Sequence, residues 1–176
     1  DPDVKNMLEL EEKVEKQIQE SLNREHEKEV QKEIMDYFVK KSKLDAPKSM
    51  IDNYLFHVIE DIKKQDPNKQ DVDEEQIKKS YAETADWSVK WYLIKDTIIS
   101  TSKLDVSNDK IQEKINEFIG KNPEQKKEIK KFYAQNQNRE KLYEDLLNNE
   151  LFNHLKEFAT NKVTEKSTAE LKKGKK

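Results

Sequence analysis

The sequence predicts an all-α protein, an elongated multi-helix domain from which helical arms protrude. Only 33% of its 176 residues are hydrophobic and 40% are charged, so a large central core is not expected. The apolar residues nevertheless recur at helical spacing, which argues against a disordered chain. Two short segments nearly repeat each other, Ser-Lys-Leu-Asp-Ala at 42–46 and Ser-Lys-Leu-Asp-Val at 102–106, and each separates two long helical patterns. The chain is therefore predicted to consist of helices joined by similar corners.

A weaker third corner is Asn161-Lys162-Val163-Thr164. In each corner one apolar residue interrupts a polar loop, namely Leu44, Leu104 or Val163. We expect each of them to insert into a groove between helices.

The first predicted helix runs from about Asp3 to Lys41. An apolar residue or histidine recurs at every fourth position: Leu10, Val14, Ile18, Leu22, His26, Val30, Ile34 and Phe38. Because a helix has about 3.6 residues per turn, this row drifts by about 40° per step and is not a heptad, which disfavours a simple coiled coil. One such row cannot bury a helix about 55–60 Å long, so much of it should be exposed to solvent.

The second helix is predicted to begin near Pro47, a residue suited to a first turn, and to end at Asp66-Pro67-Asn68. Phe56 points away from its main apolar face, which comprises Ile51, Tyr54, Leu55, Val58 and Ile62. The third helix should start at Asp73, with Gln76 placed as in a capping box, and continue to about Thr101. It has two apolar faces, so we expect it to pack on two neighbouring helices. The first face comprises Ile77, Tyr81, Ala85, Tyr92 and Ile99, and the second comprises Trp87, Trp91, Ile94 and Ile98.

Three shorter helices are predicted in the remainder. One spans about Asn108 to Ile119, with Gly120 ending it as a C-cap. Another starts at Asn122-Pro123. The last spans about Asn138 to Ala159, and because no glycine or proline separates it from the helix before it, the two could be continuous. Residues 167–176 are predicted to be a disordered, lysine-rich tail after a helical domain over residues 1–166.

Composition excludes several classes of function. The net charge is −3 with both signs interspersed, so no nucleic-acid surface is expected. There is no cysteine, no apolar run of the ~20 residues needed for a membrane span, and no recognisable signal peptide. The first residue is Asp1 rather than methionine, which is compatible with a piece of a longer protein. Gly120 and Gly174 are the only glycines, which excludes a P-loop, a dinucleotide fingerprint and a nucleophile elbow.

No catalytic or metal site is predicted. His26, His57 and His154 lie on separate predicted helices without a partner at ligand spacing. A calcium loop beginning at Asp66 fails because its sixth and twelfth positions are Asp71 and Ile77. Trp87 and Trp91 could form a stacking platform for a ligand, but core packing is the favoured interpretation because they continue an apolar face. We expect neither enzymatic activity nor a cofactor.

The corners and the helices between them resemble the C-terminal domain of bacterial trigger factor, a ribosome-associated chaperone. The resemblance begins at Lys43-Leu44-Asp45-Ala46-Pro47-Lys48-Ser49-Met50-Ile51, continues through the apolar helix at 91–99 and through Lys103-Leu104-Asp105-Val106-Ser107-Asn108-Asp109, and closes with 146–158 and 163–166. It covers nearly the whole chain. Each motif alone is weak, whereas their order and spacing are fairly specific.

The resemblance implies a bacterial, cytoplasmic, monomeric chaperone domain over residues 1–166. It would bind unfolded or nascent polypeptides in a cradle between helical arms, and contact the ribosome only through domains absent from this chain. Such a protein needs apolar patches spread over a charged frame and adaptable contacts. The alternative is a helical scaffold or adaptor with one defined protein partner. A periplasmic chaperone with a related helical domain is a further alternative, and it predicts a signal peptide upstream.

We predict that unfolded polypeptides contact apolar side chains that are not buried when the helices pack together. The alternative is that these side chains belong to an ordinary core, and the sequence does not decide between the two. Phe56 and Phe152 lie to one side of their helices' apolar faces, and Met50 has an adaptable thioether. The short fifth helix has few other apolar residues. The predicted binding residues are Met50, Phe56, Phe132, Tyr133 and Phe152.

Overall fold

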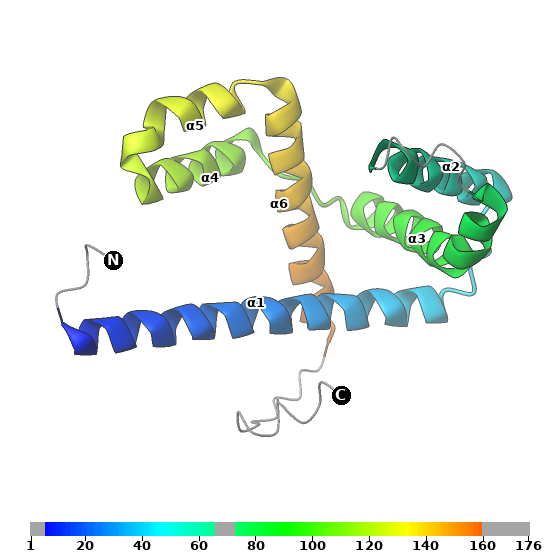
Figure 1. Cartoon of the computed structure of the whole chain (residues 1–176), viewed down its shortest axis with the longest axis horizontal. Coiled ribbons are helices and arrows are strands. Elements are labelled where there is room, and N and C mark those ends of the chain that lie inside the picture. The colour runs from blue at the N-terminus through cyan, green and yellow to red at the C-terminus, as the bar shows by residue number, and fades with distance from the viewer. Residues whose placement is uncertain (1–5, 66–72, 160–176) are drawn as a thin grey trace. The chain divides into compact units, whose positions relative to one another are not determined.

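The computed structural model describes residues 6–65 and 73–159, and most of these residues lie in helices joined by short connections. It forms six α-helices and one short 3₁₀ helix, with no strand in the described ranges, which confirms the all-α prediction. The chain divides into two compact units, the first ending at Leu104 and the second beginning at Asp105 (Figure 1). The predictions for residues 66–71, for the corner at 161–164 and for the tail at 167–176 lie outside the described residues.

The first unit contains α1 (Met7–Lys41), α2 (Lys48–Gln65) and α3 (Glu74–Ser102). α3 packs against both α1 and α2, as its two apolar faces predict. Its Ala85 and Val89 are buried, as are Leu55 and Ile59 of α2. Tyr81 and Tyr92, which we expected on the same packed face as Ala85, are instead 39% and 57% exposed. Packing therefore covers only part of that face.

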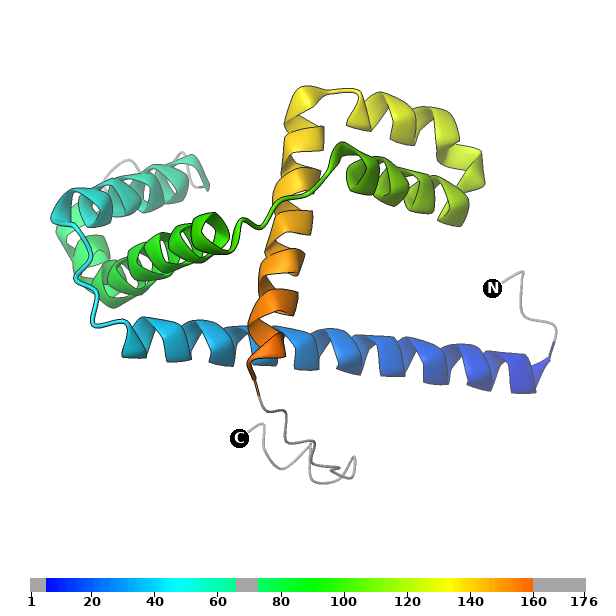
Figure 2. The same cartoon turned by 180° about the vertical axis from the view of Figure 1, so that it is seen from behind.

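α1 is the solvated helix that its sparse apolar row predicts. None of its residues is buried. Val30, Ile34 and Phe38 are half-buried, whereas the apolar residues of the N-terminal half are exposed. Figures 1 and 2 show α2 and α3 near the Lys41 end of α1, with no other helix of the first unit beside its N-terminal half.

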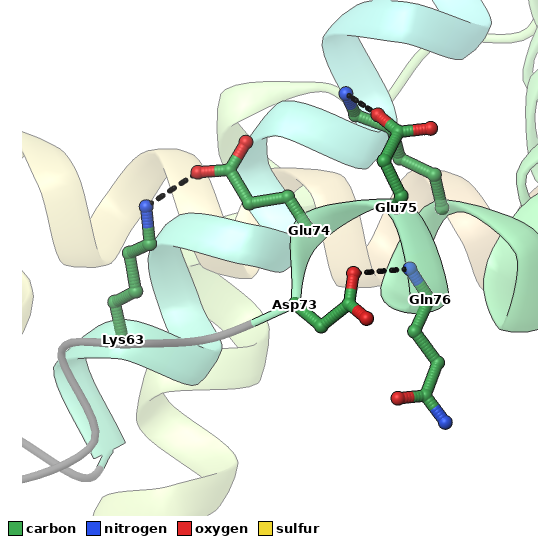
Figure 3. Close-up of polar contacts among 6 residues, drawn as sticks. Lys63, Asp73, Glu74, Glu75 and Gln76 are labelled. Atoms are coloured by element: carbon green, nitrogen blue, oxygen red, sulfur yellow. Dashed lines mark hydrogen bonds and ion pairs between the residues drawn. The ribbon is translucent and has the colours of Figure 1, made fainter.

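A short polar network joins the end of α2 to the start of α3 (Figure 3). Lys63 Nζ lies 2.7 Å from Glu74 Oε1. The Asp73 carboxylate accepts a hydrogen bond of 3.0 Å from the backbone N–H of Gln76, which confirms Asp73 as the N-cap. The hydrogen bond from Lys63 also lowers the pKa of Glu74. The Lys63–Glu74 ion pair thus links α2 to α3, while the Asp73 cap satisfies the first turn of α3.

The two repeated corners share a backbone feature. Lys43 and Lys103 have φ values of 51° and 53°, and within the described ranges they are the only non-glycine residues with positive φ. After α3, the N–H of Lys103 donates to Ser100 O and that of Leu104 to Ile99 O, at 3.4 and 3.0 Å. Leu44 and Leu104 are half-buried at equivalent positions. The similar sequences therefore share the left-handed lysine, whereas the hydrogen bonds differ, because the N–H of Leu44 donates to Ser42 Oγ at 3.3 Å.

The second unit contains α4 (Asn108–Lys121), η1 (Pro123–Gln125), α5 (Lys126–Tyr133) and α6 (Asn136–Glu157). One core cluster consists of Val106, Ile111, Ile115 and Leu142, surrounded by half-buried side chains of α4, α5 and α6. Leu151, Phe152 and Leu155 of α6 are buried as well. The start of the unit is tied to α6 by Tyr143 Oη, which donates to Asp105 Oδ1 at 2.9 Å, and this hydrogen bond raises the pKa of Tyr143.

One predicted boundary in this unit is wrong, and a second point that the sequence left open is decided. Gly120 does not end α4, because the helix continues to Lys121 and the C-cap is Asn122. The Asn122 amide donates to Phe118 O at 3.2 Å and so replaces the glycine cap. The sequence left open whether the last two helices are continuous, and the structure has two separate helices, α5 and α6. Asn138 Nδ2 donates to Phe132 O at 2.8 Å and satisfies a carbonyl at the end of α5, where the chain turns without glycine or proline.

Candidate functional site

The large apolar side chains that remain exposed are the candidate binding residues. They occur in both units and on several helices. Two groups stand out because their members are neighbours: one on the N-terminal half of α1, and one at the junction of α4, η1 and α5.

The first group, here called the α1 stripe, comprises Met7, Leu10, Val14, Ile18 and Leu22. These side chains are between 41% and 71% exposed. Glu11 and Glu15 border the stripe and line a shallow depression with it. The predicted site does not include these residues, although their four-residue spacing and the shortage of apolar partners in the sequence were signals for an exposed row.

The second group, here called the aromatic cluster, comprises Phe118, Ile129, Phe132 and Tyr133. The Phe118 and Tyr133 rings stack with centroids 5.9 Å apart and planes 12° apart. Phe132 meets Tyr133 edge to face, with centroids 5.1 Å apart. The four side chains line a shallow groove together with Asn122, Gln125 and Glu128.

Charged side chains of α4 flank the aromatic cluster. Lys114 Nζ lies 5.5 Å from the centre of the Phe118 ring, within reach of a cation–π interaction. Glu117 is 2.7 Å from the ammonium groups of both Lys114 and Lys121. Hydrogen bonds from these two lysines lower the pKa of Glu117 to about 2. Its charge is thus balanced, and this side of the cluster carries an excess of positive charge.

The structure brings together only two of the five predicted binding residues. Phe132 is 52% exposed, and Tyr133 beside it is half-buried. Phe56 is 57% exposed on α2, where its ring meets His57 edge to face at 5.6 Å, and Met50 is half-buried at the start of the same helix. Both belong to the first unit.

The expectation that Phe152 is left over by packing is wrong, because its side chain is only 8% exposed. Leu151 and Leu155 of the same helix are buried as well. At about 100° per residue, Phe152 lies only about 60° around α6 from Leu155, so one wide apolar face includes all three. Phe152 is therefore a core residue.

The tryptophans have a structural role in the first unit. Trp87 Nε1 donates to Asp36 Oδ1 at 2.8 Å and so links α3 to α1. Trp87 and Trp91 are half-buried, in agreement with packing. Asp36 could not be predicted as the partner of Trp87, because one carboxylate among many on α1 is not distinctive.

Neither a metal centre nor a membrane span is found in the part of the chain that the structure describes. No group of three potential ligands among His, Asp and Glu comes together there. None of the described helices combines the length and apolarity that crossing a bilayer requires.

The fold defines an all-α domain that carries separate groups of apolar side chains at its surface. Residues 6–157 match the family model described as bacterial trigger factor protein (TF) C-terminus. The chain belongs to this family.

Curated relatives carry the same name. The chain is 26% identical over 146 residues to trigger factor of Salinibacter ruber, covering 81% of this chain and 32% of the relative. It is 24% identical over 155 residues to trigger factor of Chlorobium phaeobacteroides, covering 86% of this chain and 36% of the relative. The chain thus spans about a third of the length of these relatives. Comparison with solved structures gave no match.

Proposed function

We propose that this chain is a chaperone domain that binds unfolded or nascent polypeptides and prevents their aggregation. The observation that carries the proposal is the presence of two apolar surfaces on separate units of a strongly charged helical frame: the exposed α1 stripe, and the aromatic cluster with its exposed Phe132 and three half-buried members. Several modest apolar patches can hold many unrelated sequences weakly, whereas one large patch would promote self-association. Membership of the trigger factor C-terminal family supports the same role.

The domain acts without catalysis and without a cofactor, as a monomer in the cytoplasm. Contact with the ribosome comes from parts of the protein other than this segment. The alternative, a scaffold for one defined partner, predicts a single high-affinity complex and no protection of unrelated proteins.

The test compares exposed and buried apolar residues. Phe56→Ala, Phe132→Ala and the pair Val14→Ser with Ile18→Ser should each lower the suppression of aggregation of a denatured test protein while leaving the melting temperature within a few degrees. The physical reason is that these side chains are largely exposed, so truncation removes little buried area. Light scattering and circular dichroism measure the two quantities.

Phe152→Ala is the matched control. Truncation of this buried ring should cost roughly 3–5 kcal/mol of stability. Wild-type activity in all the exposed-residue variants would remove these residues from the binding surface. Absence of any protection by the wild-type domain, together with one tight partner, would favour the scaffold.

A further inference from the structure

The aromatic cluster borders a strongly basic helix. Between Lys114 and Tyr133 the chain has six lysines and three glutamates, a net charge of +3 in a protein whose total is −3. Lys126, Lys127, Lys130 and Lys131 are exposed on α5 and make no ion pair within the described ranges. These four residues are here called the lysine face.

The lysine face and the aromatic cluster share one helix. At about 100° per residue, Lys126 and Lys130 lie about 20° and 60° from Tyr133 around α5, while Lys127 and Lys131 continue the face away from the rings. The α4 side adds Lys114, which lies over Phe118, and Lys121. The Glu117 carboxylate beside them is balanced by these two lysines. Among the groove-lining residues only Glu128 carries charge.

We propose that this surface selects polypeptide segments in which aromatic or aliphatic residues are flanked by aspartate or glutamate. The inference rests on the proposed chaperone function and adds a substrate class for one of its surfaces. The apolar part of the segment lies on Phe132, Tyr133 and Ile129, and its acidic flanks lie along the lysine face. Complementary charge of this kind raises association rates and discriminates between partners more than it adds affinity.

A polypeptide fits this surface better than a nucleic acid. Phe118 and Tyr133 stack on each other and are half-buried, so they do not offer free ring faces to successive bases. The exposed Gln125 amide in the groove can pair with a peptide backbone.

The experiment uses fluorescent peptides with one shared phenylalanine- and leucine-rich core, flanked by aspartates, serines or lysines. Anisotropy titrations of the full chain at low ionic strength should give about tenfold tighter binding of the aspartate-flanked than of the lysine-flanked peptide, with the serine-flanked peptide between them. Physiological salt should reduce the difference.

The quadruple change of Lys126, Lys127, Lys130 and Lys131 to Gln should abolish the preference and leave the serine-flanked peptide bound. Glu128→Gln should strengthen binding of the aspartate-flanked peptide about twofold.

The matched control changes four exposed lysines of α1, Lys16, Lys28, Lys32 and Lys40, to Gln. It alters the net charge equally and should keep the preference. Equal binding of the three peptides by the wild type, or a preference that survives in the lysine-face variant, would overturn the inference while leaving the chaperone proposal intact. Failure to bind any peptide would overturn both. Tighter binding of a single-stranded RNA oligonucleotide, lost in the lysine-face variant, would assign the surface to nucleic acid instead.

Discussion

The pKa of Glu117, beside the aromatic cluster, is set by two neighbouring lysines. Glu117 is exposed, yet its contacts with Lys114 and Lys121 lower its pKa from 4.5 to about 2. Because the folded-state pKa is depressed, the favourable interaction is fully present above pH 4.5 and is lost as the pH falls toward 2. Glu117 thus stabilises α4 only when ionised.

The titration of Glu117 can be followed directly by carboxyl ¹³C NMR. We expect a midpoint near pH 2 in the wild type. The double variant Lys114→Gln with Lys121→Gln should move the midpoint toward 4.5, because both hydrogen-bond donors are lost. An unchanged midpoint in that variant would show that other groups hold the carboxylate.

At the residue scale, the sequence predicted helical positions better than exposure. Phe56, Phe132 and Phe152 share a similar pattern, one aromatic beside an apolar face, yet only Phe152 is buried. Burial depends on which neighbour meets each arc of a helix, and periodicity within one helix does not contain that information. The Asp36–Trp87 hydrogen bond, across 51 residues, was invisible for the same reason.

Among the elements, the repeated corners were the most predictable feature. Their shared sequence correctly indicated shared geometry, including two lysines in the left-handed region. The wrong boundary at Gly120 has the opposite origin. Glycine permits a helix end, but Asn122 can satisfy the last carbonyls with its own amide, so the helix continues past the glycine.

The corner after α3 can be stabilised by substitution. A non-glycine residue in the left-handed region destabilises the folded state by roughly 1–2 kcal/mol, and glycine removes this strain. Glycine also raises the conformational entropy of the unfolded chain, which costs about 0.5–1 kcal/mol of stability. Lys103→Gly should therefore stabilise the first unit by about 0.5–1 kcal/mol. Chemical denaturation monitored by tryptophan fluorescence measures this, since Trp87 and Trp91 lie in that unit.

Lys79→Gly is the control for Lys103→Gly. This exposed residue lies inside α3, where glycine should destabilise by about 0.5–1 kcal/mol. Destabilisation by both substitutions would mean that the Lys103 side chain makes a contact worth more than its backbone strain.

At the scale of the whole molecule, the division into two units predicts separable unfolding. Leu142→Ala removes a side chain that is only 6% exposed in the core of the second unit and should cost about 2–5 kcal/mol there. Both tryptophans belong to the first unit. The variant should therefore shift the thermal transition seen by far-ultraviolet circular dichroism and leave the tryptophan emission transition in place.

Coincident shifts of both signals would show that the two units unfold as one cooperative block.

The overall dimensions of the chain stay a prediction from composition. A compact globule of this length would have a radius of gyration of about 16 Å, and small-angle scattering should give a larger value.

The left-handed lysines have a consequence for proteolysis. Trypsin cleaves after lysine, and it cuts preferentially in exposed connections outside regular helices. Of the described lysines, Lys43 and Lys103 lie between helices, and each is exposed. The first tryptic cuts within the described part of the chain should therefore fall at these two corners, and they separate α1 from α2 and α3 from the second unit. The sequence repeat that joins the helices also marks where a protease takes them apart.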